Sequence, residues 1–205
     1  EAQIIGRLKH FVSRSALDIE GLGEKQINLF YSNGFVKKYS DIYYLENMKS
    51  ELCNLEGWGE LSFNNLIKAI NDKKKFSLSK LIYSLGIRFV GEKNSIAISE
   101  AFTSVNDFSK ILDNLKSKSA RKKYSMIEID GLGPKAINSF FEYLDYDENR
   151  IEVLRLLKIC EISIDKIPLK ESIITGKKLL FTGSLESMSR AEAKTKAERL
   201  GAKVV

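Results

Sequence analysis

The chain has 205 residues, enough for one large domain or two small ones, and its hydrophobic share of 43% excludes a disordered or collagen-like protein. The net charge is +6, but residues 168–205 carry +4 of it, which leaves 25 basic against 23 acidic residues in positions 1–167. That nearly neutral part can hold a polyanion only through local placement and backbone donors, because its bulk charge is too small.

The sequence also bears on compartment and metal content. No apolar run reaches the roughly 18 residues of a membrane helix, and no secretion signal opens the chain, so we expect a cytoplasmic protein without membrane contact. Cys53 and Cys160 lack metal-ligand spacing, and the single His10 cannot complete a Cys/His cluster. We therefore expect no metal ligands and two free, buried thiols. The first residue is Glu1 rather than Met, which suggests a fragment of a longer protein.

One short glycine pattern occurs four times along the chain. The copies are Ile19-Glu20-Gly21-Leu22-Gly23-Glu24-Lys25, Leu55-Glu56-Gly57-Trp58-Gly59-Glu60-Leu61, Ile87-Arg88-Phe89-Val90-Gly91-Glu92-Lys93 and Ile129-Asp130-Gly131-Leu132-Gly133-Pro134-Lys135. Their second glycines are 36, 32 and 42 residues apart. The last interval is the longest, and residues 106–123 hold the surplus.

Apolar residues at helical spacing flank every copy, as with Phe11 and Val12 before the first and Ile27 and Phe30 after it. The spacing predicts a helix, a glycine hairpin and a second helix, repeated four times. The fold class that follows is mainly α.

The residue types in the hairpin suit phosphate binding. Two glycines around one apolar residue can adopt positive φ and allow another backbone to approach closely, while the apolar residue turns inward. The amides that open the second helix then face outward and carry the positive end of its dipole. Lys25, Lys93 and Lys135 add a cation at the same place in three copies, and Leu61 breaks the rule in the second.

The third and fourth copies have features of their own. Phe89 stands where the other copies have their first glycine, so we expect this turn to rely on Gly91 alone. Pro134 fits the first turn of a helix, where its missing N–H costs nothing.

Three other interpretations of these residues remain open. Gly-x-Gly before a helix can be a tight helix connection and nothing more. The stretch from Gly131 to Ala136 fits a dinucleotide-binding fingerprint, which requires a preceding parallel strand. The basic runs 73–75 and 116–123 can be solvated segments or DNA contacts.

The four repeats resemble helix-hairpin-helix motifs. The resemblance implies binding to DNA phosphates in the minor groove without sequence readout, and it implies two motif pairs, each with a pseudo-two-fold axis.

The last part of the chain has a different character. Residues 162–175 contain a proline and look like a linker, and Lys177–Gly183 reads as a strand that ends in glycine. Ser189-Arg190-Ala191-Glu192 is a capping box for a helix that ends at Gly201, and a second, parallel strand follows. This β-α-β start is similar to the opening of a BRCT domain. In BRCT domains that bind phosphopeptides a Ser/Thr-Gly pair holds phosphate here, which makes Thr182 and Gly183 candidates. An ordinary strand-to-loop turn is the alternative.

The opening stretch from Ala2 to Gly23 resembles the bacterial NAD-dependent DNA ligases. In that family an Ala-Gln pair closes a zinc module and a Ser-Arg pair precedes the first hairpin, which makes Arg14 a phosphate-contact candidate. The domains implied are a helix-hairpin-helix DNA-binding domain over 1–161, a linker over 162–175 and an incomplete BRCT domain over 176–205. The DNA-binding residues implied are Arg14, Gly21, Gly23, Lys25, Gly57, Gly59, Gly91, Lys93, Gly131, Gly133 and Lys135.

The family seals nicks between a 3′-hydroxyl and a 5′-phosphate in duplex DNA, in replication and repair. The resemblance implies NAD and Mg²⁺ in the parent enzyme, Zn²⁺ in the module upstream, and adenylation, OB-fold and zinc domains elsewhere in the same protein. The sequence has no Lys-x-Asp-Gly adenylation motif, so we expect no catalytic residue in this chain and no activity by itself. The partner expected is nicked double-stranded DNA, at the nucleoid.

Two other classes remain open. A protein-interaction module would use the hairpins only to brace helices. The tail of another helix-hairpin-helix repair protein, such as an excision nuclease subunit, would carry fewer copies and no BRCT start. A glycosylase fits poorly, because it would need a catalytic Asp soon after a single hairpin and a base pocket, whereas this chain has four hairpins.

Overall fold

The structure, a computed structural model, describes residues 2–115, 129, 132–164, 172–183, 193–194, 196–197 and 200–204. The chain divides into two compact units, Glu1–Asp165 and Lys166–Val205. Gly131, the basic run 116–123 and the capping box at 189–192 lie outside the described residues. Within the described part, no helix is both long enough and apolar enough to cross a membrane.

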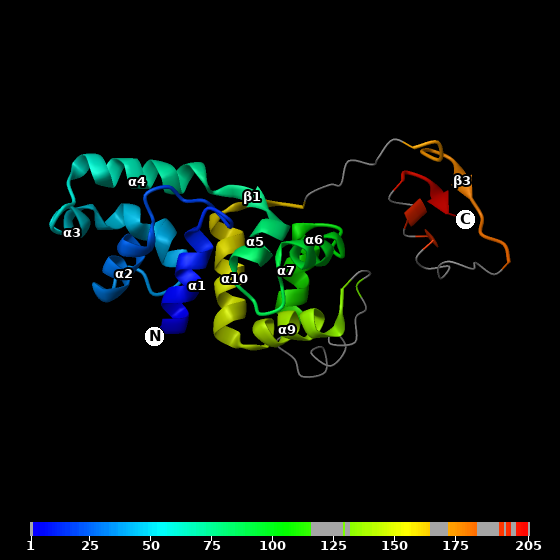
Figure 1. Ribbon diagram of the computed structural model, residues 1–205, viewed down its shortest axis with the longest axis horizontal. Coiled ribbons are helices and arrows are strands. Elements are labelled where there is room, and N and C mark those ends of the chain that lie inside the picture. The colour runs from blue at the N-terminus through cyan, green and yellow to red at the C-terminus, as the bar shows by residue number, and fades with distance from the viewer. Residues whose placement is uncertain are drawn as a thin grey trace. The chain divides into compact units, whose positions relative to one another are not determined.

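The first unit is mainly helical, which confirms the fold class (Figure 1). Its first elements are α1 (Ala2–Val12), α2 (Glu24–Ser32), the 3-10 helix η1 (Ser40–Met48), α3 (Lys49–Cys53) and α4 (Glu60–Asp72). They are followed by β1 (Lys75–Ser77), α5 (Leu78–Ser84), α6 (Glu92–Glu100), α7 (Val105–Asn114), α9 (Pro134–Asp145), α10 (Asp147–Ile159) and β2 (Glu161–Ser163).

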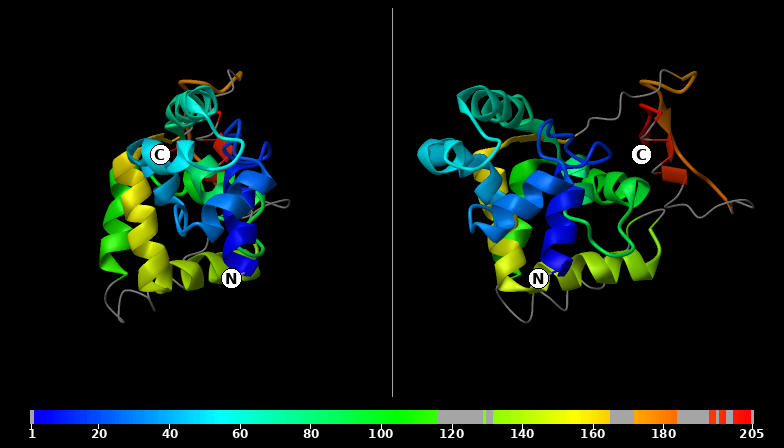
Figure 2. Two further views of the ribbon diagram at one scale, coloured as in Figure 1. Left: turned by 90° about the vertical axis from the view of Figure 1, so that its left-hand side faces the viewer. Right: turned by 60° about the vertical axis from the view of Figure 1, so that its left-hand side comes forward.

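Figure 1 shows α1 to α4 gathered at one end of this unit and α5 to α9 at the other, with α10 between them. Both views in Figure 2 place α4 along one edge, next to α3 and η1. The second glycine of each hairpin directly precedes α2, α4, α6 or α9, as the helical spacing predicts. Pro134 is the first residue of α9, as expected from its missing N–H.

Pairs of aromatic rings stabilise the packing within each end of the first unit. Phe30 of α2 lies 5.1 Å, between ring centroids, from Trp58 of the second hairpin. At the other end, Phe108 of α7 lies between Phe102 and Phe140, at 5.0 and 6.5 Å. Ring pairs at such distances stabilise a core beyond the area that they bury. The hairpin helices are therefore fixed to one another by rings rather than by the turns alone.

A two-stranded parallel sheet joins β1 to β2, with Lys75 opposite Glu161 and Ser77 opposite Ser163. The sequence did not suggest this pair, since the first strand begins at Lys75, the last residue of a stretch interpreted as a basic run. The partners are far apart in the chain, so only the tertiary fold brings them together.

Two charged side chains are buried in α10. Arg150 Nη1 donates to the Leu144 carbonyl at 3.1 Å, and its other nitrogen pairs with Asp147. Glu152 accepts a 2.6 Å hydrogen bond from the backbone N–H of Ser40. Buried charges are tolerated when they are paired in this way. The two contacts tie α10 to the end of α9 and to the start of η1.

The second unit contains β3 (Lys178–Leu179) paired in parallel with β4 (Lys203–Val204). The parallel pairing is the predicted one, although β3 is shorter than Lys177–Gly183. Gly201 has φ +78°, a conformation that suits a glycine after the end of a helix, and the Ala202 N–H donates to the Ala197 carbonyl at 2.9 Å. In this unit Ala193, Ala197 and Ala202 are buried, whereas Ile173 and Leu180 are 88% and 68% exposed.

The two cysteines differ in environment. Cys160 is buried as expected, but Cys53 is only half-buried, because α3 is a short helix at the edge of the unit. Burial raises the pKa of the Cys160 thiol to about 11. At pH 8 only about one thousandth of it is thiolate, the reactive form.

A thiol reagent at pH 8 will therefore modify Cys53 first and leave Cys160 unmodified until the fold opens. Counting modified thiols by mass spectrometry before and after adding denaturant checks this order. Raising the pH toward 11 will speed the Cys160 reaction, and fast modification of Cys160 at pH 8 would contradict the burial.

Candidate nucleic-acid interface

The four hairpins share one backbone hydrogen bond. The N–H of the middle apolar residue donates to the carbonyl three residues earlier, at 3.0 to 3.3 Å. The donors are Leu22, Trp58, Val90 and Leu132, and the acceptors are Ile19, Leu55, Ile87 and Ile129. The sequence repeat is thus a structural repeat of one tight turn.

The third residue of that turn adopts the left-handed conformation in every copy that is described there. Gly21 and Gly57 have φ of +82° and +79°, and Phe89 has φ +64°. The expectation that the third turn relies on Gly91 alone is wrong, because Phe89 itself takes the conformation reserved for glycine. A bulky residue pays about 1–2 kcal/mol for it. Asn94 supports the turn by donating to the Phe89 carbonyl at 2.8 Å.

The middle apolar residues point inward as predicted. Leu22, Val90 and Leu132 are buried and Trp58 is half-buried. The turn is therefore pinned to the helices through its centre, and the residues on either side of it stay at the surface.

The second glycines act as the N-caps of the following helices, and none of them has positive φ. Gly23, Gly59, Gly91 and Gly133 have extended backbones with φ between −135° and −73°. No side chain caps these four helices, whereas Ser77 and Ser104 accept from the first-turn amides of α5 and α7. A first-turn amide without an intrahelical or side-chain partner is free to bind an anion.

The space in front of these caps is open. A Cβ built on Gly59, Gly91 or Gly133 meets no heavy atom within 4 Å, and one on Gly23 meets only the Gln26 side chain at 3.3 Å. Any residue adopts these backbone angles, so the fold itself does not require glycine here.

The predicted cations lie at the surface. Lys25, Lys93 and Lys135 are exposed at the second position of their helices, and Arg14 is exposed after α1. Side chains in a helix lean toward its N-terminus, so these lysines lie over the free amides. Leu61 occupies the same position in α4 and is 75% exposed.

Glutamates that open the first two hairpin helices are neutralised. Lys9 Nζ lies 2.6 Å from a Glu24 carboxylate oxygen, and Lys49 Nζ lies 2.8 Å from Glu60. The hydrogen bond and charge of each lysine hold the pKa of the paired carboxyl below its ordinary value. The carboxylates stay ionised at neutral pH, but their repulsion of an approaching phosphate is reduced.

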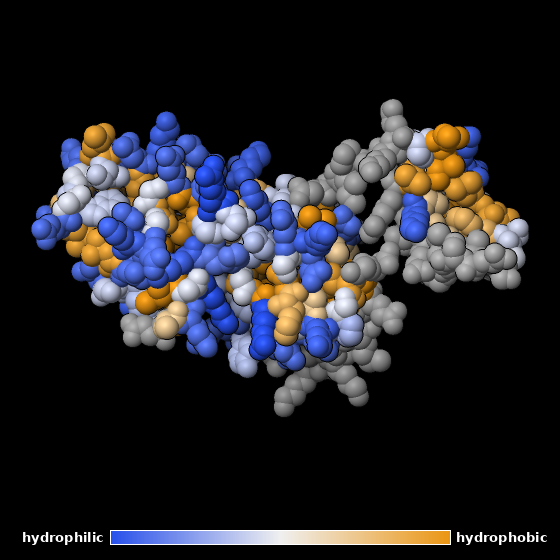
Figure 3. Space-filling view, in the orientation of Figure 1, coloured by the Kyte–Doolittle hydropathy of each residue, from blue (hydrophilic) through white to orange (hydrophobic). Residues whose placement is uncertain are grey.

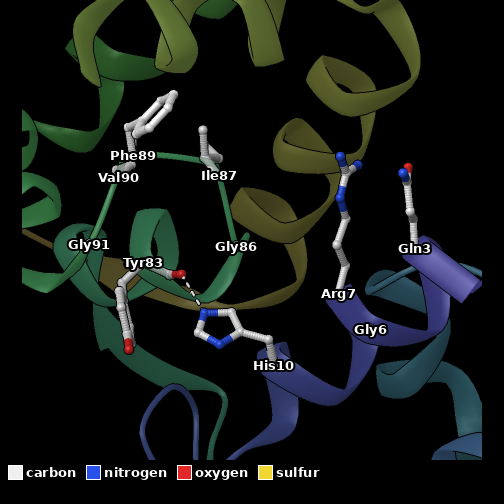
Figure 4. Close-up of a pocket in the computed structure, with 10 residues that line it drawn as sticks. All are labelled: Gln3, Gly6, Arg7, His10, Tyr83, Gly86, Ile87, Phe89, Val90 and Gly91. Atoms are coloured by element: carbon white, nitrogen blue, oxygen red, sulfur yellow. Dashed lines mark hydrogen bonds between the residues drawn. The ribbon is translucent and has the colours of Figure 1, made fainter. Parts of the chain in front are cut away.

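Two hollows flank the hairpins. One of about 610 Å³ lies between the first two and is lined by Gly21, Gly57 and Trp58 among others. A second, also of about 610 Å³, is lined by Arg7 of α1 and by Phe89 and Gly91 of the third hairpin, among others (Figure 4). His10 plays a structural part there, since its Nε2 donates to the Tyr83 carbonyl at 2.9 Å.

The basic run 73–75 is not a free cationic patch. Lys73 pairs with Asp18 at 3.2 Å, and Lys75 pairs with Glu161 at 3.0 Å. Figure 3 shows mixed hydrophilic side chains, with apolar patches among them, on the visible face of the first unit. Local geometry rather than a charged face distinguishes the hairpins.

Thr182 and Gly183 are both exposed at the end of the segment after β3, and Gly183 has φ +84°. That conformation fits the strand-to-loop turn, and the phosphate role stays a prediction.

Sequence reasoning did not single out Arg7 or Asn94, and it misjudged the turn at Phe89. Aligning the four copies on their middle residue would have placed Phe89 at the positive-φ position. Arg7 could not be found this way, because it lies 84 residues before Gly91 and only the packing of α1 on α5 brings it close.

Comparison with known proteins agrees with this geometry. Residues 80–153, which include the third and fourth hairpins, match the family profile described as a helix-hairpin-helix motif. The chain is 42% identical over 204 residues to a DNA ligase of Bradyrhizobium diazoefficiens, 39% over 208 to one of Roseobacter denitrificans and 37% over 207 to one of Rickettsia bellii. These matches cover 98–99% of this chain but only 28–30% of each relative. Over nearly its whole length, this chain is therefore similar to a segment that makes up about 30% of the length of these bacterial DNA ligases.

Proposed function

We propose that this chain is the DNA-binding portion of an NAD-dependent DNA ligase, and that it holds duplex DNA on both sides of a nick without reading its sequence. In this proposal residues 1–161 form the DNA-binding domain, 162–175 a linker and 176–205 the start of a BRCT domain. The division into compact units at residue 165 supports that organisation. The parent protein would act in replication and repair, in the bacterial cytoplasm at the nucleoid.

The observation that carries the proposal is the fourfold use of one turn before an uncapped helix. Each helix start offers backbone N–H donors that no side chain caps, and backbone donors recognise phosphates without regard to base sequence. If each hairpin contacts about two phosphates, the four account for roughly eight contacts shared between the strands. The exposed lysines beside three of the hairpins add charge to the same contacts.

The reaction chemistry belongs to other parts of the parent protein. The described residues contain no group of three or more His, Cys, Asp or Glu placed to hold a metal ion, and the sequence lacks the lysine motif that would accept AMP. We therefore place NAD, Mg²⁺ and Zn²⁺ in other domains of the parent protein, since the described residues offer no such ligand group. The contribution proposed is affinity and positioning of the nick for the adenylation and OB-fold domains.

Titration of a fluorescent nicked duplex with the full chain at 50 and 200 mM salt tests this function. Eight phosphate contacts predict an affinity that falls by about 10³- to 10⁵-fold between the two conditions. Duplexes of unrelated sequence should bind equally. A protein-interaction module would instead show no salt-dependent affinity, and that result would remove the proposal.

Leu61 offers a gain-of-function prediction. Leu61→Lys places a cation where Lys25, Lys93 and Lys135 already stand, on an exposed position of α4. One more phosphate contact should steepen the slope of log affinity against log salt by about 0.9 and tighten binding about 5- to 10-fold at 0.1 M salt. The control is Leu61→Gln, which removes the apolar side chain without adding charge. If the slope of log affinity against log salt is unchanged in Leu61→Lys, the second hairpin does not contact the DNA.

A further inference from the structure

The third hairpin carries a residue that its own fold does not favour. Phe89 adopts φ +64° at the position where the first two hairpins have glycine. Phe89 is 51% exposed, so burial of its ring offsets little of the free-energy cost of the strained backbone. Glycine would satisfy this turn better than phenylalanine.

The surrounding residues hold the ring at the surface. The Arg88 guanidinium lies over the ring, 4.8 Å from its centroid, and Asn94 holds the backbone of the same residue through its carbonyl. Figure 4 shows the ring at the tip of the loop, on the side away from Tyr83. A fixed, exposed aromatic ring with a cation on one face is arranged to contact something outside the protein.

The position relative to the helix start narrows the choice of partner. Phe89 lies two residues before Gly91, whose helix α6 has no side-chain cap. If the amides of α6 bind a phosphate, the ring beside them reaches the sugars and base edges of the same strand. Apolar side chains placed in this way in minor-groove proteins loosen a base step.

We infer that Phe89 is an aromatic wedge that enters the minor groove of the bound duplex and partly unstacks one base step beside the phosphate held by α6. The inference rests on the proposed function and assigns a separate task to one of the four hairpins. The first, second and fourth hairpins bind the DNA phosphate backbone. The third does so too, and its binding also depends on how easily two stacked bases separate. A nick is a place where stacking is weak, so the wedge favours DNA positioned with the nick near this hairpin.

The variant Phe89→Gly tests the wedge because the two roles of the residue predict opposite results. Glycine relieves the strained turn, so the melting temperature should rise. Loss of the ring should weaken binding to nicked duplex about 5- to 50-fold, as expected for one aromatic contact with a base. Phe89→Asn also tolerates positive φ and supplies no ring, so it should behave like the glycine variant without making the loop more flexible.

Base unstacking is measured directly with 2-aminopurine placed at successive positions around the nick. The wild-type chain should raise the fluorescence at one step, and both variants should abolish that rise. Equal affinity and unchanged fluorescence in Phe89→Gly and Phe89→Asn would overturn the wedge while leaving the hairpin grip in place. Failure of the wild-type chain to bind DNA at all would instead overturn the proposed function.

Discussion

Replacing Gly59 with valine will weaken binding to nicked duplex about 10- to 100-fold and leave the fold intact. Gly59 has φ −135° and ψ 177°, an extended conformation that suits valine, and its Cβ would meet nothing within 4 Å. The valine methyl groups would fill the space in front of the first-turn amides of α4. A phosphate kept from those donors loses charge-assisted hydrogen bonds worth about 1.5–3 kcal/mol.

Fluorescence anisotropy with three duplexes of unrelated sequence measures this effect, and the loss should be the same for all three. Ser50→Val is the matched control, because it places the same exposed side chain on the neighbouring α3. Circular dichroism should show both variants folded. Full affinity in Gly59→Val would mean that the helix start of α4 does not touch DNA.

Replacing Phe108 with alanine will destabilise the first unit by about 3–5 kcal/mol. The ring is 1% exposed and lies between Phe102 and Phe140, so its removal leaves a cavity between α6, α7 and α9. For a unit of this size the loss should lower the melting temperature on the order of 10 °C.

Phe89→Ala removes the same atoms from an exposed position and serves as the control, with an expected change below about 1 kcal/mol. Urea unfolding of the full chain, followed by circular dichroism, gives the free energies. Fluorescence of Trp58, the single tryptophan, reports the first hairpin pair, and a shift there shows that the two ends unfold together. A loss of unfolding free energy below about 1 kcal/mol in Phe108→Ala would mean that the surrounding side chains close the cavity without a free-energy cost.

The hairpins and their helices could be predicted from the chain because every signal for them is local. The repeated pattern around the middle apolar residue marks each turn, and apolar residues at helical spacing mark the helix that follows it. The same holds for Pro134 at the start of α9 and for the positive φ of Gly201. Residues within a few positions of each other decide all of these features.

The ion pairs and the pairing of β1 with β2 escaped prediction because their partners are distant in the chain. Lys75 reads as part of a basic run until β1 pairs with β2 and brings Glu161 beside it. Likewise, Lys9 and Lys49 have no marked function in the sequence, yet they neutralise the glutamates at two helix starts. Apparent charge along the chain is therefore a poor guide to the charge that a phosphate would meet.

By itself, then, the sequence determined the fourfold turn and the helices that follow it, because short-range sterics and periodicity decide them. Only the tertiary structure decided which side chains stand free at the surface. Packing of distant segments paired Lys75 of β1 and Lys9 of α1 with glutamates. It also brought Arg7 to the pocket beside the third hairpin and left Phe89 outside the core in a strained conformation. These outcomes depend on which surfaces the neighbouring helices bury, and a local sequence pattern does not contain that information.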